Sequence, residues 1–144
     1  MEARFDSMAK DQLPGFKEMR RLLYSKNVPV EDIVAAGDEL ARAERYSDAL
    51  DLYENAQNLE GVRSIAEKAF SDGDVGIWMK ARRILKEPIT VEEWGKLAEV
   101  ALSAEKPHFA LFAYKRAGNE AKVEELQRTL SGDKGLVPPP KETP

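Results

Sequence analysis

The sequence predicts an all-α protein in which about three helical hairpins are stacked in chain order, with a capping helix on either side. Two observations lead to this prediction. Helix formers such as alanine, leucine, glutamate, lysine and arginine dominate the composition, and runs of β-branched residues are few. One pattern of small and large residues also occurs three times, with roughly 30 residues between copies. That spacing suits two antiparallel helices whose apolar faces are buried only by a neighbouring hairpin.

The repeated pattern places a small residue four positions after a large one, then an alanine, then a second large residue. The three copies contain Ile33, Gly37, Ala49 and Tyr53; Ile65, Ala69, Ala81 and Leu85; and Trp94, Ala98, Ala110 and Tyr114. The interval from Gly37 to Ala69 is 32 residues, and that from Ala69 to Ala98 is 29. Helices that cross closely need residues with almost no side chain at the contact. We therefore expect Gly37 to face Ala49 and Ala98 to face Ala110.

Composition and charge limit the classes of function. The 144 residues are enough for one domain that folds without disulfides or a metal. No cysteine is present, which excludes thiolate nucleophiles and cysteine zinc sites and agrees with a cytoplasmic location. No stretch has the apolar length of a signal peptide core or a membrane span, so we expect neither export nor membrane insertion. The net charge is −4, and an acidic surface disfavours nucleic-acid binding.

The chain begins with a weakly patterned segment, residues 1–13, which we expect to be poorly ordered. Pro14 and Gly15 then break any helix. Residues 16–25 have the spacing of a short amphipathic helix, with an apolar face formed by Phe16, Met19, Leu22 and Leu23. Such a helix could bind a membrane surface or a partner. We favour the interpretation that it covers the first face of the stack.

The first predicted hairpin follows Pro29. A helix is expected over residues 31–44, because Glu31 and Asp32 fall in its first turn, where the helix dipole favours acids. Ser47 is the expected N-cap of the next helix, which extends through residue 57.

The second predicted hairpin contains helices over residues 60–70 and from about residue 75 onward. Residues 71–74 form the turn between them, and Asp74 is suited to cap the later helix. Pro88 ends that helix, because proline cannot continue it.

The third predicted hairpin has the clearest helix signals. Thr90 and Glu93 have the spacing of a capping box, and Pro107 suits the first turn of the following helix. Gly118 ends that helix. A last helix over residues 120–130 has the mixed surface of a final cap.

Three segments result from this assignment. Residues 1–13 form the N-terminal segment, and residues 14–131 form one helical repeat domain. Residues 132–144 form a proline-rich tail that we expect to be disordered.

The repeated positions resemble the tetratricopeptide repeat family over residues 31–117. The first copy matches at Ile33, Ala36, Gly37, Leu40, Ala49, Tyr53 and Ala56. The third copy matches at Trp94, Leu97, Ala98, Ala101, Ala110, Tyr114 and Ala117, with tryptophan at the family's tryptophan position. The middle copy matches at Ile65, Ala69, Ala81 and Leu85. The resemblance implies a right-handed α–α superhelix. A looser resemblance connects the chain with the helical solenoids of vesicle-coat and intraflagellar-transport proteins.

By this resemblance, the first helix of each hairpin would line a concave groove. The groove-facing candidates are Glu31, Val34, Asp38, Arg42, Arg63, Ala66, Phe70, Glu92, Glu99 and Leu102. Because this set is acidic with apolar members, it favours a peptide or helix that is basic or mixed apolar and basic. The expected function is a non-enzymatic adaptor or scaffold that binds another protein. The alternative is a structural or self-associating subunit of a larger assembly, such as a trafficking or coat-like complex.

Few residues suggest chemistry. His108 is the only histidine, and no nucleophile motif accompanies it. Asp72 and Asp74 flank a glycine but lack the other ligands of a calcium loop, so we expect a turn and no metal or cofactor. The two tryptophans, Trp78 and Trp94, suit core packing better than ligand stacking. A basic cluster of Lys80, Arg82, Arg83 and Lys86 suits a solvated face better than an acidic partner or RNA.

Overall fold

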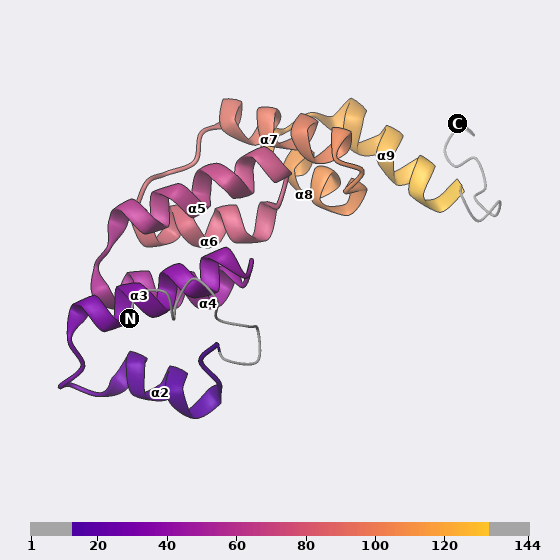
Figure 1. The fold of residues 1–144 in the computed structure, drawn as a ribbon. Coiled ribbons are helices and arrows are strands. Elements are labelled where there is room, and N and C mark those ends of the chain that lie inside the picture. Colours follow the sequence, from indigo (N-terminus) through magenta and orange to yellow (C-terminus); the bar gives the residue numbers. More distant parts are fainter. Residues whose placement is uncertain (1–12, 133–144) are drawn as a thin grey trace, which may run out of the picture. The chain divides into compact units, whose positions relative to one another are not determined.

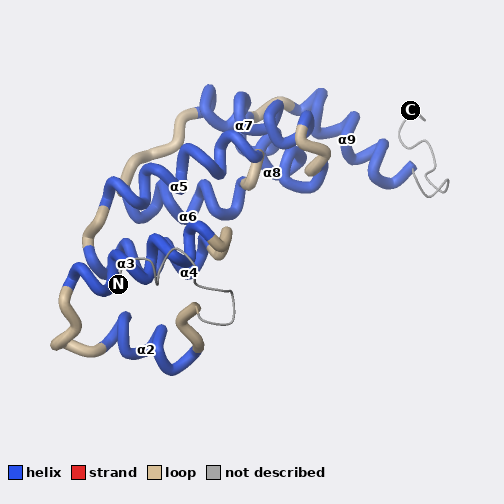
Figure 2. The backbone as a smooth tube through the Cα atoms, in the orientation of Figure 1, coloured by secondary structure: helices blue, strands red, loops and turns tan. Residues whose placement is uncertain are grey.

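The computed structural model describes residues 13–132, and within that range it contains eight helices and no strand (Figures 1 and 2). In chain order these are α2 (Phe16–Tyr24), α3 (Val30–Arg42), α4 (Tyr46–Ala56), α5 (Leu59–Asp72), α6 (Val75–Leu85), α7 (Val91–Ser103), α8 (Pro107–Ala117) and α9 (Glu120–Gly132). The all-α prediction is confirmed. Contacts between consecutive helices are consistent with a stack of helical hairpins. The predictions for residues 1–12 and 133–144 lie outside the described residues.

Three hairpins, α3–α4, α5–α6 and α7–α8, have nearly the same dimensions. Their first helices begin at Val30, Leu59 and Val91, which places 29 and then 32 residues between equivalent points. Their second helices begin at Tyr46, Val75 and Pro107, with the same two intervals. The predicted order of 32 and then 29 is therefore wrong. The three extra residues lie in the loop between α6 and α7, not inside the middle hairpin.

The corrected spacing changes which residues of the middle hairpin are equivalent to those of the other two. Val62 and Ala66 take the places predicted for Ile65 and Ala69, and both are buried. Trp78 stands where the other hairpins have Ala49 and Ala110, and Arg82 stands where they have the tyrosines Tyr53 and Tyr114. The Arg82 guanidinium lies 5.2 Å from the centre of the Trp78 ring. The large aromatic group has thus moved one turn toward the start of the second helix.

Two compact units divide the chain. The first unit contains the residues up to Lys68 together with Ile77–Glu87, and the second contains Ala69–Gly76 together with the residues from Pro88 onward. The boundary therefore passes through α5 and α6 of the middle hairpin.

The helices from α3 to α8 all end in the same way. A residue after each helix takes a left-handed conformation, with φ between 57° and 77°. The next backbone N–H then donates to a carbonyl five residues earlier, as Arg45 does to Leu40 at 2.8 Å. Only two of the six left-handed residues are glycines; the six are Glu44, Gln57, Gly73, Lys86, Glu105 and Gly118.

The starts of the helices agree with the sequence in two cases and differ in one. The Thr90 and Glu93 capping box is present, with the Glu93 N–H donating to Thr90 Oγ1 at 3.1 Å. Pro107 is the first residue of α8. The predicted N-cap at Ser47 is wrong, because the turn is already complete at Glu44 and Arg45 and α4 begins at Tyr46.

Tyr53 is the centre of the packing in the first unit. A Cβ atom added to Gly37 would lie 2.8 Å from Cε1 on one edge of the ring, and one added to Gly61 would lie 2.8 Å from Cε2 on the opposite edge. The atoms nearest to Gly37 therefore belong to Tyr53 and not, as predicted, to Ala49. Both glycines leave room for one buried aromatic ring.

Two further contacts complete the units. In the first unit, the Asn55 side chain donates to the Leu22 carbonyl at 2.7 Å, which joins α4 to α2. Of the apolar residues predicted to face inward on α2, Leu22 is buried, but Phe16 is 76% exposed. In the second unit, Gly73 lies against α7, and a Cβ there would be 2.7 Å from the Ala101 Cα.

Candidate functional site

The first helix of each hairpin carries an acidic residue at the same two places. One place is in the first turn and holds Glu31 on α3, Glu60 on α5 and Glu92 on α7. The other is seven residues later and holds Asp38, Glu67 and Glu99. Because helical residues seven apart lie on one face, each first helix has an acidic face of its own. Five of the six residues are exposed, and Asp38 is half-buried.

Two of these acidic residues, Glu60 and Glu67, were not predicted. With the predicted interval of 32 residues, the positions equivalent to Glu31 and Asp38 were Arg63 and Phe70. With the observed interval of 29 residues, they are Glu60 and Glu67. The recurrence of acid at both places was a signal in the sequence that could have fixed the middle hairpin correctly.

Asp38 is held by the core as well as facing outward. The Tyr53 hydroxyl donates to Asp38 Oδ1 at 2.5 Å. Burial of the ring, followed by this hydrogen bond, raises the pKa of Tyr53 well above its usual range. The phenol therefore keeps its proton and fixes the direction of the carboxylate. Asp38 is a preset acceptor at the surface of α3.

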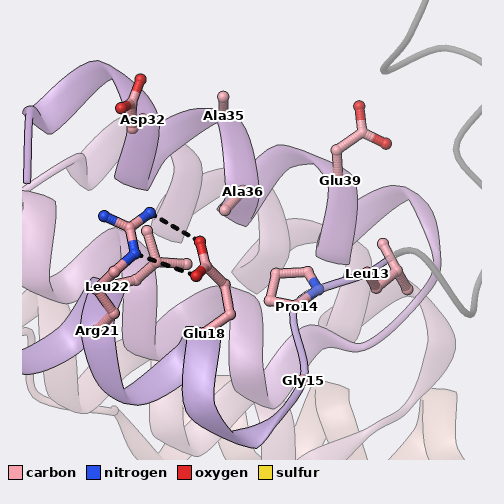
Figure 3. A pocket seen from close by; sticks show the side chains of 10 residues that line it. All are labelled: Leu13, Pro14, Gly15, Glu18, Arg21, Leu22, Asp32, Ala35, Ala36 and Glu39. Atoms are coloured by element: carbon pink, nitrogen blue, oxygen red, sulfur yellow. Dashed lines mark hydrogen bonds and ion pairs between the residues drawn. The ribbon is translucent and has the colours of Figure 1, made fainter.

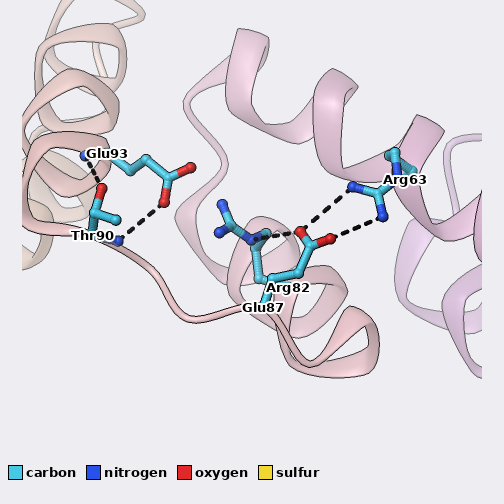
Figure 4. A network of polar contacts seen from close by, with 5 residues as sticks. All are labelled: Arg63, Arg82, Glu87, Thr90 and Glu93. Carbon is cyan, nitrogen blue, oxygen red and sulfur yellow. Dashed lines mark hydrogen bonds and ion pairs between the residues drawn. The ribbon is translucent and has the colours of Figure 1, made fainter.

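Two predicted groove cations are already paired. Arg42 bonds Glu39 on the same helix. Arg63 on α5 bonds Glu87 with an Nη2 to Oε2 distance of 2.9 Å, and Glu87 also faces Arg82 (Figure 4). Pairing removes much of the positive charge of both arginines from the exposed surface. The acidic character of the first helices is thereby increased.

The apolar candidates are less exposed than the acidic ones. Val34, Phe70 and Leu102 are half-buried, whereas Ala66 is buried and does not reach the surface. Phe70 and Leu102 occupy equivalent positions on α5 and α7, where α3 has Ala41. Within their own helices they offer partly exposed apolar surface beside the acidic face.

A pocket of about 520 Å³ lies in the first unit between α2 and α3 (Figure 3). Its apolar lining is formed by Leu13, Pro14, Leu22, Ala35 and Ala36, and its charged lining by Glu18, Arg21, Asp32 and Glu39. None of the predicted groove residues lines this pocket. It depends on how α2 packs against α3, which no single-helix pattern reveals.

The charges of the pocket have a net negative balance. Arg21 bonds Glu18 at 2.8 Å, and this hydrogen bond lowers the pKa of the Glu18 carboxyl (Figure 3). Glu39 is only 5% exposed and is paired with Arg42. Asp32 is exposed at the rim. Three carboxylates and one guanidinium around an apolar floor suit the side chain of a lysine or an arginine.

The basic cluster predicted on α6 is largely engaged within the first unit. Lys80 reaches α4, where its Nζ lies 2.8 Å from Ser47 Oγ and 2.8 Å from Asp51 Oδ1. Arg82 stacks on Trp78 and faces Glu87. Arg83 and Lys86 are exposed.

Other features suggest no chemistry. His108 is exposed in the first turn of α8. Among residues 13–132, no group of three or more histidine and carboxylate side chains is arranged to hold a metal ion. No helix in this described range is both long and apolar enough to cross a membrane.

Comparison of the chain with models of known protein families, with curated proteins and with solved structures found no match. The functional interpretation therefore depends on the residues and contacts above.

Proposed function

We propose that this protein is a non-enzymatic adaptor of the cytoplasm that binds a basic or mixed basic and apolar segment of another protein. The observation that carries the proposal is the recurrence of acid at two equivalent places on three first helices. Acidic faces attract lysine and arginine side chains and disfavour acidic competitors. The half-buried side chains of Phe70 and Leu102 supply apolar contacts beside two of those faces.

We further propose that the hairpins form a right-handed superhelix of the tetratricopeptide type. Support comes from polar contacts that join successive elements at a nearly constant sequence separation. Asn55 bonds Leu22 across 33 residues, Lys80 bonds Ser47 across 33, and Lys106 bonds Asp72 across 34. A repeat of about 34 residues is that of the tetratricopeptide family.

The proposal is tested with peptides selected from a random displayed library on the purified full chain. We expect the selected peptides to combine lysine or arginine with leucine, valine or phenylalanine. In the variant E60K/E67K, which reverses the acidic face of α5, their affinity should fall about tenfold or more. Binding is measured by fluorescence anisotropy, and folding by circular dichroism.

A matched variant, E54K/E124K, makes the same change in net charge at exposed glutamates on α4 and α9. It should weaken binding by less than about twofold, since long-range charge effects are screened by salt. Equal loss of affinity in both variants, or selection of acidic peptides, would refute the first-helix site.

The pocket between α2 and α3 is tested separately by D32K. Glu31 and Asp32 are adjacent in the same helical turn, but only Asp32 lines the pocket. A basic anchor in the pocket predicts loss in D32K with little effect of E31K, and the first-helix site predicts the reverse.

A second candidate function is a self-associating subunit of a larger, coat-like assembly. It is favoured by large exposed apolar side chains at Phe16, Tyr24 and Leu59. Light scattering over a range of concentrations decides this case, because a constant monomer mass at high concentration contradicts self-association.

A further inference from the structure

A strip of one face of α8 combines two exposed aromatic rings with an arginine. Phe109 and Phe112 are each 38% exposed, and Arg116 is exposed one turn beyond Phe112. The spacing of three and then four residues places them on one side of the helix. We refer to Phe109, Phe112 and Arg116 as the α8 strip. It belongs to the second unit and contains none of the residues of the proposed first-helix site.

Equivalent positions in the first hairpin are used for polar contacts. On α4 they are Asp48, Asp51 and Asn55. Asp48 pairs with Arg45, Asp51 with Lys80, and Asn55 with the Leu22 carbonyl. The α8 strip replaces these three short polar side chains by two phenylalanines and an arginine, which solubility alone would not favour.

The arginine of the strip is held in place by aromatic rings. Its guanidinium carbon lies 4.7 Å from the centre of the Phe112 ring and 5.5 Å from that of Trp94. The two rings are 6.0 Å apart and tilted by 59°. Stacking on aromatic faces restricts the guanidinium and leaves its N–H groups at the edge of the group.

The N–H donors of Arg116 have no carboxylate or carbonyl acceptor among the residues that the structure describes. By contrast, Arg21, Arg42, Arg45 and Arg63 are all paired with acids. The α8 helix itself contains no aspartate or glutamate. The strip thus presents a fixed, unpaired cation beside apolar surface in a chain whose net charge is −4.

We propose that the α8 strip is a second protein-binding surface, whose partner is a segment carrying a carboxylate next to large apolar side chains. The carboxylate would accept two parallel hydrogen bonds from Arg116, and the apolar side chains would cover Phe109 and Phe112. The opposite arrangement exists inside the first unit, where the Asp51 carboxylate at the place equivalent to Phe112 meets the Lys80 ammonium. This surface prefers a partner opposite in charge to that of the first-helix site.

The probe for the experiment is a short synthetic helix of leucine and glutamate, compared with the same helix containing lysine in place of glutamate. Binding to the full-length protein is followed by fluorescence anisotropy and by the NMR signal of the Arg116 Nε–H. We expect the glutamate helix to bind and to shift that signal. R116Q and F112A should each weaken binding about tenfold, while remaining folded because both side chains are exposed.

The control is K115Q, which removes the same charge from the adjacent exposed residue of α8. It should weaken binding by less than about twofold. Equal weakening by K115Q and R116Q, or equal binding of the lysine helix, would overturn the proposal. So would displacement of the glutamate helix by oligouridylate, which would indicate a nucleic-acid surface.

Two other occupants are distinguished by the same NMR signal. A shift of the Arg116 Nε–H on raising the protein concentration would show that a second copy covers the strip. A shift caused by D133N or E142Q would show that the chain's own C-terminal segment does so. Either result would overturn the proposal of a separate partner. Because R116Q leaves the acidic first helices unchanged, binding of basic peptides tests the proposed function independently.

Discussion

Tyr53 shows at the residue scale how one side chain requires small residues on two other helices. The phenol ring comes from α4, whereas the glycines that flank its two edges, Gly37 and Gly61, come from α3 and α5. The hydrogen bond from its hydroxyl to Asp38 fixes the fourth direction. A ring held on both edges and at its tip cannot turn away to accept an added methyl group.

We predict that G37A and G61A each lower the free energy of unfolding by about 1 to 3 kcal/mol, because the added Cβ overlaps the Tyr53 ring. G95A is the control, since a Cβ on this glycine of α7 meets nothing within 4 Å. It should raise stability by up to about 1 kcal/mol through helix propensity. Urea denaturation measures all three. A neutral G37A would show that the ring moves freely.

The importance of Gly37 could be predicted from the sequence, but its partner could not. A glycine at an apolar position of a helix indicates a close approach of some other group. Which group approaches depends on the rotamer of Tyr53 and on Gly61 in the next hairpin. Those are tertiary facts, and the same holds for the carboxylate direction of Asp38 at the candidate site.

At the scale of the element, the helix ends govern how closely hairpins approach one another. Thr90, Pro107 and Gly118 have strong local preferences, and the sequence therefore predicted their roles correctly. Four of the six left-handed closing residues are Glu, Gln or Lys, which have no such preference. Because these turns carry no glycine signal, the middle hairpin was assigned three residues out of step, and Glu60 and Glu67 were missed.

We predict that G73A is much more destabilising than G118A, although both glycines have φ above 70°. The strain of alanine in the left-handed region lowers the free energy of unfolding by about 1 kcal/mol in both variants. Only at Gly73 would the methyl group also meet backbone, at 2.7 Å from the Ala101 Cα, whereas the space around Gly118 is open. The total at Gly73 should reach about 3 kcal/mol or more.

Thermal and urea unfolding measure the difference between these two variants. Similar losses in G73A and G118A would mean that α7 moves away from the turn between α5 and α6 without resistance. The close contact would then contribute nothing to the placement of the third hairpin.

At the scale of the whole molecule, contacts are dominated by neighbours in the chain. The helix pairs α3–α4, α7–α8 and α8–α9 account for most of the close packing between elements. Polar links such as Lys106 to Asp72 reach only across one hairpin length. In chains of this kind, stability is close to a sum over units and the interfaces between adjacent units.

Helical class and hairpin number were predictable because they follow from local periodicity and from breakers such as Pro29 and Pro88. The pocket beside Asp32 and the α8 strip were not predictable in the same way. Each depends on side chains from two elements, such as Trp94 and Arg116, that only the packed hairpin brings together. The acidic faces lie between these cases, because their residues are local but their equivalence requires correct helix bounds.

We predict that K106M destabilises the second unit locally. The Lys106 ammonium donates to the Asp72 carbonyl at 2.8 Å, and methionine keeps most of the side-chain volume without that bond. The loss should be about 1 to 2 kcal/mol. In native-state hydrogen exchange, the amides of α7 and α8 should lose protection by that amount, while those of α3 and α4 stay near wild type. K115M, at an exposed lysine of α8, is the control and should leave both sets unchanged. A uniform loss of protection in K106M would instead mean that the described helices unfold as one cooperative body, because the weakened link would then lower the stability of every amide equally.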